Sequence, residues 1–376
     1  MQITLNQSIY NTKNNNYYYK FQHKNINQNN NLENISEYSP VQLSAANFPN
    51  VNFRMNADAK FLLSQNKIFN CAYTDSLLLS PQELHTIYKK LQKRPNIQSA
   101  INLLCVYEKY MLGVESGIYG IFSEAPHKGK YNFQDILNQL RLEAIIGLKS
   151  KQDEILESIT PEINMLSKPL KKEVLAIRDE AYEKMYDDTF YRRRPLAEIK
   201  SIKGGEETPI LIDIYRKLYK LPNSSRNIDA FIVKYAKEDH QAIARRLVST
   251  AGATIEHTIP KARGGQDDLE NFLLVSARFN NERDTMSLGE FIMLNDDIPI
   301  KDNLQKYVDK AIRQINNRTP AFVDKIWYPD SIKENVLSET NNEILLDTSA
   351  LKPTKAQVKD NQAHKKLNEK YIVMSK

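Results

Sequence analysis

The segment that decides the fold runs from Ala253 to Asp284 and reads ATIEHTIPKARGGQDDLENFLLVSARFNNERD. In it, Glu256 stands directly before His257. Asn271 follows fourteen residues after the histidine, and Asn280 another nine residues later. A carboxylate and an amide supply the oxygen ligands that hard divalent cations prefer, and a neutral imidazole can take a proton from water near neutral pH. This pattern is typical of a one-metal phosphodiesterase site.

The spacing of these four residues resembles that of the HNH endonuclease family, whose fold is a β-hairpin and a helix that clasp one divalent metal ion. Many members have histidine at the last position. Asparagine there resembles the HNH nuclease domain of CRISPR effector proteins. The resemblance implies a first strand over 253–256, a loop that holds Pro260 and Gly264-Gly265, a second strand over 273–275 and a helix that begins near Ser276.

The resemblance also implies a role for each residue of the motif. Glu256 and Asn280 would bind one divalent cation, Mg²⁺ or Mn²⁺. His257 would be the general base, and Asn271 would brace the hairpin and orient the histidine. Three basic residues are expected to contact the phosphates of the nucleic acid, namely Lys261, Arg263 and Arg283. The acidic residues between them are expected to be solvated charges rather than further ligands; these are Asp267, Asp268, Glu270 and Glu282.

The sequence departs from the family at the structural zinc that many members hold with a Cys-x-x-Cys pair on each side of the hairpin. Only Cys71 remains of the four thiols, in Cys71-Ala72-Tyr73-Thr74, and Ser276-Ala277-Arg278-Phe279 stands where the second pair would be. One thiolate cannot complete a tetrahedral zinc site, so no structural zinc is expected. Tyr73 and Phe279 are expected to fill the space. This interpretation predicts that residues 67–91 pack against the distant hairpin.

Composition sets limits on the class of protein. The chain has 376 residues, of which 41% are hydrophobic, enough for two modest domains or for one domain with a large insertion. A net charge of +6 permits a polyanionic partner without requiring one. Two cysteines cannot build a disulfide framework, so we expect the cytoplasm. No apolar run approaches the roughly 18 residues that span a bilayer, and the N-terminus does not resemble a secretion signal. No membrane role is expected.

Hydrophobic periodicity predicts helices on both sides of the motif. A short strand is expected over 69–73, and the sequence Ser80-Pro81-Gln82-Glu83 predicts a helix start with a capping box. Further helices are expected over 97–112, 209–219, 228–248 and 302–316, with another capped by Ser287. With the resemblance, these elements predict an α+β fold that is predominantly helical, with a small ββα-metal HNH core and a large helical insertion or lobe.

The expected organisation has five parts. Residues 1–50 are asparagine-rich and lack periodicity, which is typical of a disordered leader. The other four parts are an N-terminal helical part that packs on the core (51–130), a charged helical insertion or arm (131–205), the HNH nuclease domain (206–328) and a polar C-terminal tail (329–376).

The resemblance implies an endonuclease that hydrolyses DNA with one metal ion and a histidine base, and the expected substrate is double-stranded DNA. The alternative is an inactive nucleic-acid-binding or scaffold protein that keeps the fold, as the missing zinc cysteines suggest. Against this alternative, the metal and base positions all hold usable chemistry. A protein-interaction role of the helical arm is compatible with both. The sequence leaves open DNA or RNA, base preference, oligomeric state, and a role in restriction, phage defence, homing or toxicity.

Overall fold

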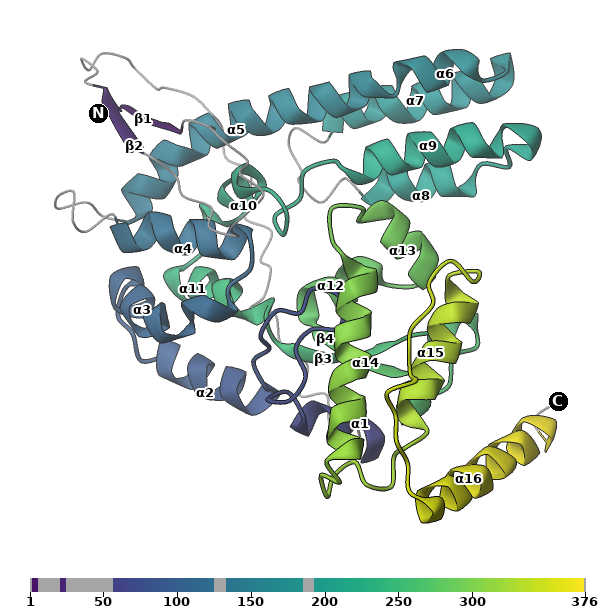
Figure 1. Cartoon of the computed structure of the whole chain (residues 1–376). Coiled ribbons are helices and arrows are strands. Elements are labelled where there is room, and N and C mark those ends of the chain that lie inside the picture. The colour runs from purple at the N-terminus through teal and green to yellow at the C-terminus, as the bar shows by residue number, and fades with distance from the viewer. Residues whose placement is uncertain (1, 6–20, 25–56, 125–132, 185–192, 375–376) are drawn as a thin grey trace.

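The computed structural model describes residues 2–5, 21–24, 57–124, 133–184 and 193–374 (Figure 1). The fold is α+β and predominantly helical, as expected, with a two-stranded antiparallel sheet formed by β3 (Ala253–His257) and β4 (Phe272–Ser276). Strands β1 (Gln2–Leu5) and β2 (Phe21–Lys24) pair in a second small sheet, and the rest of the predicted leader lies outside the described residues. None of the described helices is long and apolar enough to cross a membrane.

The motif forms a hairpin followed by a helix. Strand β3 (Ala253–His257) pairs with β4 (Phe272–Ser276) in a register that places His257 opposite Phe272. Helix α12 (Ala277–Arg283) follows β4 directly and lies against β3. Every residue of β4 is buried, which explains why its sequence, FLLVS, is almost continuously apolar. The strands and helix are within one or two residues of those that the resemblance implied.

The segment before α2 packs on this hairpin, although it lies far away in sequence. The backbone amide of Ala72 donates to the Leu274 carbonyl at 2.9 Å, and Leu79 exchanges backbone bonds with Ala251 and Ala253 at 2.9 and 2.7 Å. Part of the segment 67–91 therefore contacts the hairpin, through Ala72 and Leu79, whereas α2 (Pro81–Leu91) contributes to a second core. The strand expected over 69–73 is wrong, because this stretch is a turn closed by the bond from the Cys71 amide to the Ser76 carbonyl.

A second core lies beside the hairpin. It is built by α2 (Pro81–Leu91), α3 (Ile97–Leu104), α4 (Val114–Glu124), α10 (Ile228–Tyr235), α11 (His240–Ser249) and the first half of α5 (Phe133–Ser158). The capping box of α2 forms as predicted, with Ser80 and Glu83 bonding each other's backbone amides. The helix expected over 97–112 continues after Leu104 as a 3-10 helix. The helix expected over 228–248 is broken, because the Asp239 side chain caps the start of α11.

The second half of α5 belongs to a separate helical lobe, which extends away from the hairpin in Figure 1. The lobe contains α6 (Thr160–Met165), α7 (Lys168–Lys184), α8 (Arg193–Ser201) and α9 (Thr208–Tyr219). Its core is aliphatic and includes Leu211, Ile214 and Leu218 of α9. The helical arm predicted for 131–205 therefore extends through α9, because the apolar face of α9 packs on α6 and α8.

The chain after the motif forms α13 (Leu288–Leu294), α14 (Ile300–Asn316), α15 (Tyr328–Glu339) and α16 (Lys355–Met374). Side chains of α13, α14 and α15 pack in the same core as the hairpin. Residues 329–376 differ from the polar tail expected, since Ile332 and Val336 of α15 are completely buried. The hydroxyl of Tyr328, at the start of α15, donates to the Phe272 carbonyl at 3.0 Å. The spacing of the two apolar residues by four places them on one face of the helix.

Candidate functional site

The last two residues of β3 point to opposite sides of the hairpin, because side chains alternate along a strand. Glu256 is 3% exposed and faces the interior. The imidazole of His257 lies nearer to the surface, with 20% of the side chain exposed. The hairpin thus separates a buried carboxylate from a partly accessible imidazole within two consecutive residues.

One oxygen of Glu256 is engaged and the other is not. Oε1 accepts a hydrogen bond from Nη1 of Arg283 at 2.8 Å. Oε2 is buried and has no hydrogen-bond partner within the described part of the chain. Burial raises the pKa of Glu256 to about 7, and the neighbouring Arg283 guanidinium opposes that rise. A buried carboxylate oxygen that lacks a donor is an atom that a bound cation could satisfy.

Arg283 is fully buried at the end of α12. Its guanidinium donates to Glu256, to the Tyr73 hydroxyl at 3.0 Å, and to backbone carbonyls at 2.6–3.1 Å; the carbonyls are those of His257, Thr258 and Met286. The structure therefore places Arg283 inside the protein rather than where it was expected, at a nucleic-acid phosphate. The physical reason is that several hydrogen-bond acceptors meet at the end of β3, and the N–H groups of one guanidinium can satisfy them together.

The ring of His257 is held at two points. Its Nε2 atom lies 3.2 Å from Oδ1 of Asp267, and the ring packs edge-on against Phe272, with 5.0 Å between centroids and 90° between planes. Partial burial lowers the pKa of His257, and the hydrogen bond to Asp267 opposes this effect. The lowered pKa favours the neutral imidazole, the form that accepts a proton.

Asn271 ties the loop between the strands together. Its Nδ2 atom donates to the carbonyls of Ile259 and Gln266 at 2.9 and 3.0 Å, and its Oδ1 accepts from the Ile259 amide at 2.8 Å. The Asn271 carbonyl also accepts from the Thr258 amide at 2.8 Å. Buried amides that use both ends in this way fix a loop in one conformation. The residue is placed to brace the hairpin, and none of these hydrogen bonds involves the His257 ring.

Gly265 is a residue of this loop whose importance was not apparent from the sequence. A Cβ atom at this position would lie 1.7 Å from the Ile259 carbonyl oxygen and 2.7 Å from Nδ2 of Asn271. Gly264 instead adopts a positive φ of 91° with open space around it. The Gly-Gly pair thus serves two needs, since only its second member allows the backbone to approach Asn271.

Asn280 lies on α12 beside the middle of β3. Its Nδ2 atom donates to the Thr254 hydroxyl at 3.2 Å and to the Ile255 carbonyl at 3.4 Å. Because a carbonyl can only accept, these contacts orient the amide. No hydrogen bond among the described residues uses Oδ1 of Asn280, which leaves that oxygen able to bind a cation.

The two other basic residues expected at phosphates are exposed on the loop that follows β3. The side chain of Lys261 is 59% exposed and that of Arg263 is 51% exposed. Both have acidic neighbours, since Nζ of Lys261 lies 2.9 Å from Asp267 and Nε of Arg263 lies 3.6 Å from Glu339. Unlike Arg283, these two residues can reach a bound polyanion.

The space between Cys71 and the end of β4 is filled by side chains. Sγ of Cys71 accepts a hydrogen bond from the Ser276 amide at 3.4 Å. Tyr73 and Phe279 are buried in the same core, as expected, and Tyr73 also packs against Phe291 with 5.2 Å between ring centroids. Cys71 thus serves as a core residue that also accepts one backbone bond.

The oxygen atoms available at the motif fit one hard cation in chemistry. They comprise Oε2 of Glu256 and Oδ1 of Asn280, a carboxylate and an amide. Within the described ranges, no group of three or more histidine, cysteine, aspartate or glutamate side chains is arranged to hold a metal. A site that uses one carboxylate and one amide would not form such a group, and substrate and water oxygens would complete it.

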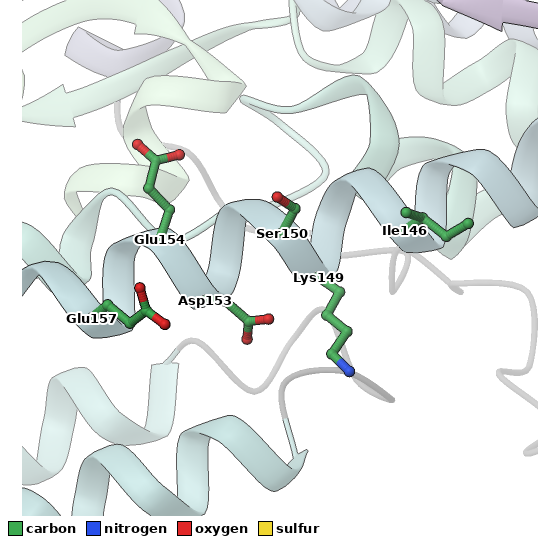
Figure 2. A pocket seen from close by; sticks show the side chains of 6 residues that line it. All are labelled: Ile146, Lys149, Ser150, Asp153, Glu154 and Glu157. Atoms are coloured by element: carbon green, nitrogen blue, oxygen red, sulfur yellow. The ribbon is translucent and has the colours of Figure 1, made fainter.

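A surface hollow shown in Figure 2 lies on α5, away from the motif in sequence. It is lined by Ile146, Lys149, Ser150, Asp153, Glu154 and Glu157. Three carboxylates and one ammonium project from a single helix there (Figure 2). None of the motif residues takes part, so the candidate site is defined by the hairpin and its polar groups rather than by this hollow.

Comparison of the chain with models of protein families, with curated proteins and with solved structures found no match, so the interpretation of the site depends on its own residues.

Proposed function

We propose that this protein is a metal-dependent HNH-type endonuclease that hydrolyses phosphodiester bonds of DNA. The observation that carries the proposal is that β3, which ends with Glu256 and His257, pairs with β4 and lies against α12, the helix that carries Asn280. The spacing of these residues in sequence supports the same activity, because it resembles that of the HNH family.

In this proposal His257 takes the proton of the attacking water. Its lowered pKa keeps the ring neutral at physiological pH, and a base is effective when it is unprotonated at the working pH. Glu256 and Asn280 would hold one Mg²⁺ or Mn²⁺ ion. When bound, such an ion stabilises the negative charge that develops on the phosphate and on the leaving oxygen.

Lys261 and Arg263 would contact the DNA backbone next to the cleaved bond. Both side chains are exposed on the loop between the strands, the loop that also carries the partner of His257. Lysine and arginine bind phosphates without regard to sequence. The proposal therefore gives this loop an anchoring role and assigns it no base preference.

A plasmid-nicking assay with Mg²⁺, with Mn²⁺ and with EDTA tests the proposal. The wild type should cut in the presence of either metal and not in EDTA. His257→Ala should lower the rate by about 100- to 10,000-fold, the usual contribution of a general base. Its matched control is His85→Ala, since His85 is exposed on α2, and this variant should cut like the wild type. Cutting by His257→Ala at the wild-type rate would overturn the proposal.

One observation favours a second function, a nucleic-acid-binding protein without nuclease activity. Glu256 is buried and paired with Arg283, and a guanidinium at that carboxylate opposes the approach of a cation. The same assay separates the two, because the second function predicts retention of DNA in a gel-shift experiment with no cleavage in any metal. Lys261→Ala should weaken that retention in both cases.

A further inference from the structure

We propose that Asp267 is a positioning residue that fixes the tautomer of His257, with the proton on Nε2 and the proton-accepting lone pair on Nδ1. This inference rests on the proposed function for its catalytic consequence. Its structural content, the placement of one proton on one ring, stands independently of any cleavage. It also replaces the expectation that Asp267 is only a solvated loop charge.

The first argument comes from the chemistry of the contact. Nε2 of His257 and Oδ1 of Asp267 are 3.2 Å apart, within reach of a hydrogen bond. An ionised carboxylate can only accept, so the ring nitrogen must donate. A neutral imidazole carries one N–H, and Nδ1 is then left with the lone pair that can take a proton from water.

The second argument is that Asp267 is held in its ionised form. Nζ of Lys261 lies 2.9 Å from Oδ2, the oxygen that His257 does not use. The hydrogen bond from Lys261 lowers the pKa of Asp267, and the bond to His257 lowers it further. Lys261 therefore has a contact within the protein besides any that it makes to DNA.

The third argument is that the ring is also oriented from a second side. Phe272 lies opposite His257 in the register of β3 and β4 and meets the ring edge-on at 5.0 Å. The aromatic contact restricts the plane of the ring, and the Asp267 contact fixes its direction within that plane. A second partner that orients a functional histidine is a recurrent feature of hydrolytic sites.

The neighbouring Asp268 provides a matched control. Its carboxylate caps the 3-10 helix η5 (Leu269–Asn271) by accepting from the Asn271 amide at 3.2 Å. Asp268→Asn therefore perturbs the loop without altering the partner of His257. Asp324 is a distant control, since it is 70% exposed and lies beside Lys325.

Nuclear magnetic resonance of the full chain labelled with [¹⁵N]histidine tests the tautomer directly. The ring signals of His257 are identified by their loss in His257→Ala. At an alkaline pH where the ring is neutral, the wild type should show Nε2 protonated and Nδ1 bare. Asp267→Asn should shift this pattern toward a mixture, because an amide can either accept from or donate to Nε2. Asp267→Glu, Asp268→Asn and Asp324→Asn should keep the wild-type pattern.

Single-turnover cleavage then tests the consequence. Asp267→Asn should lower the rate by about 10- to 100-fold, as loss of such a partner does elsewhere, at an unchanged metal midpoint. Asp267→Glu should recover most of that loss, and Asp324→Asn should match the wild type. A wild-type tautomer or a wild-type rate in Asp267→Asn would overturn the inference. If the wild type does not cut at all, the proposed function fails, and the nitrogen signals still decide where the proton lies.

Discussion

The hairpin with the helix after it (253–283, the hairpin unit) and the helical lobe of α5–α9 are stabilised in different ways. Around the hairpin, charged and amide side chains are buried, among them Glu256, Asn271 and Arg283. In the lobe, the fully buried cluster is aliphatic, and Gln152 is the only buried polar residue that the described part of the lobe contributes. Ion pairs such as Lys217 with Glu162, at 2.7 Å, are partly exposed to solvent.

The difference indicates where the protein tolerates change. An aliphatic core accepts swaps that conserve volume, whereas a buried polar network loses stability when a single partner is removed. The hairpin unit should therefore be sensitive to substitutions that leave its shape intact, and the lobe should not. Two experiments test this contrast, and a third tests the joint where α5 meets α10; they are given from the largest expected effect to the smallest.

The most severe test removes the buried guanidinium. Arg283→Ala should lower the free energy of unfolding by about 3–5 kcal/mol, because it leaves Glu256 buried without its partner. The Tyr73 hydroxyl and three carbonyls lose a donor as well. Urea unfolding followed by circular dichroism measures the loss. Lys217→Ala removes an ion pair of the lobe and should cost less than about 1 kcal/mol. Equal losses of unfolding free energy in Arg283→Ala and Lys217→Ala would contradict the expected difference between the hairpin unit and the lobe.

A smaller effect is expected in the loop of the motif. Gly265→Ala should cost about 1–3 kcal/mol, because the added methyl group meets the Ile259 carbonyl and the amide of Asn271. The loop would move and cleavage should fall with it. Gly264→Ala is the control, with a cost of about 1 kcal/mol from its positive φ alone and cleavage retained. Thermal unfolding and the nicking assay measure both. A larger loss of stability in Gly264→Ala than in Gly265→Ala would show that backbone strain outweighs steric crowding in this loop.

The mildest test concerns the joint between α5 and α10. Asp229 lies so close to α5 that a Cβ atom at Gly147 would be 2.8 Å from its carboxylate, and burial raises its pKa to about 6. A carboxyl whose pKa is higher in the folded state stabilises the fold at low pH, and this contribution is lost as pH rises from about 4 to 6. Asp229→Asn should remove that part of the pH dependence and raise stability at pH 7 by about 1 kcal/mol.

Urea unfolding at several pH values between about 4 and 7 checks this prediction. Asp153 of the same helix α5 offers the control, because it lines the surface hollow of Figure 2. Asp153→Asn should leave the pH profile unchanged. An identical profile in Asp229→Asn and the wild type would show that the carboxyl of Asp229 does not titrate at this joint.

The sequence predicted what depends on local spacing. The hairpin, the helix after it and the capping box of α2 each depend on residues within one continuous segment of the chain. The packing of the Cys71 segment was also predictable, because the remnant of a Cys-x-x-Cys pair identified its partner. The buried position of Arg283 was not, since its contact with Tyr73 spans 210 residues and no local pattern distinguishes it from an exposed arginine.

Two further differences have the same origin. The break before α11 depends on the side chain of Asp239 capping a helix within an otherwise continuous apolar pattern. Helix α15 was hidden by its polar composition, although Ile332 and Val336 are completely buried. In both cases one or two side chains decide the outcome, and an average over a window of sequence does not register them.

The backbone hydrogen bonds that join Leu79 to Ala251 and Ala253, at the start of β3, have a consequence for synthesis and for protein engineering. The segment that carries Ala72, Tyr73 and Leu79 is synthesised before the hairpin motif, and its contacts with the motif can form only after residues 253–284 have been made. A fragment containing only residues 253–284 would lack Tyr73, which accepts a hydrogen bond from Arg283. It would also lack Leu79, so the free edge of β3 could associate with another chain. The motif is contiguous in sequence, but its fold depends on residues that lie far outside it.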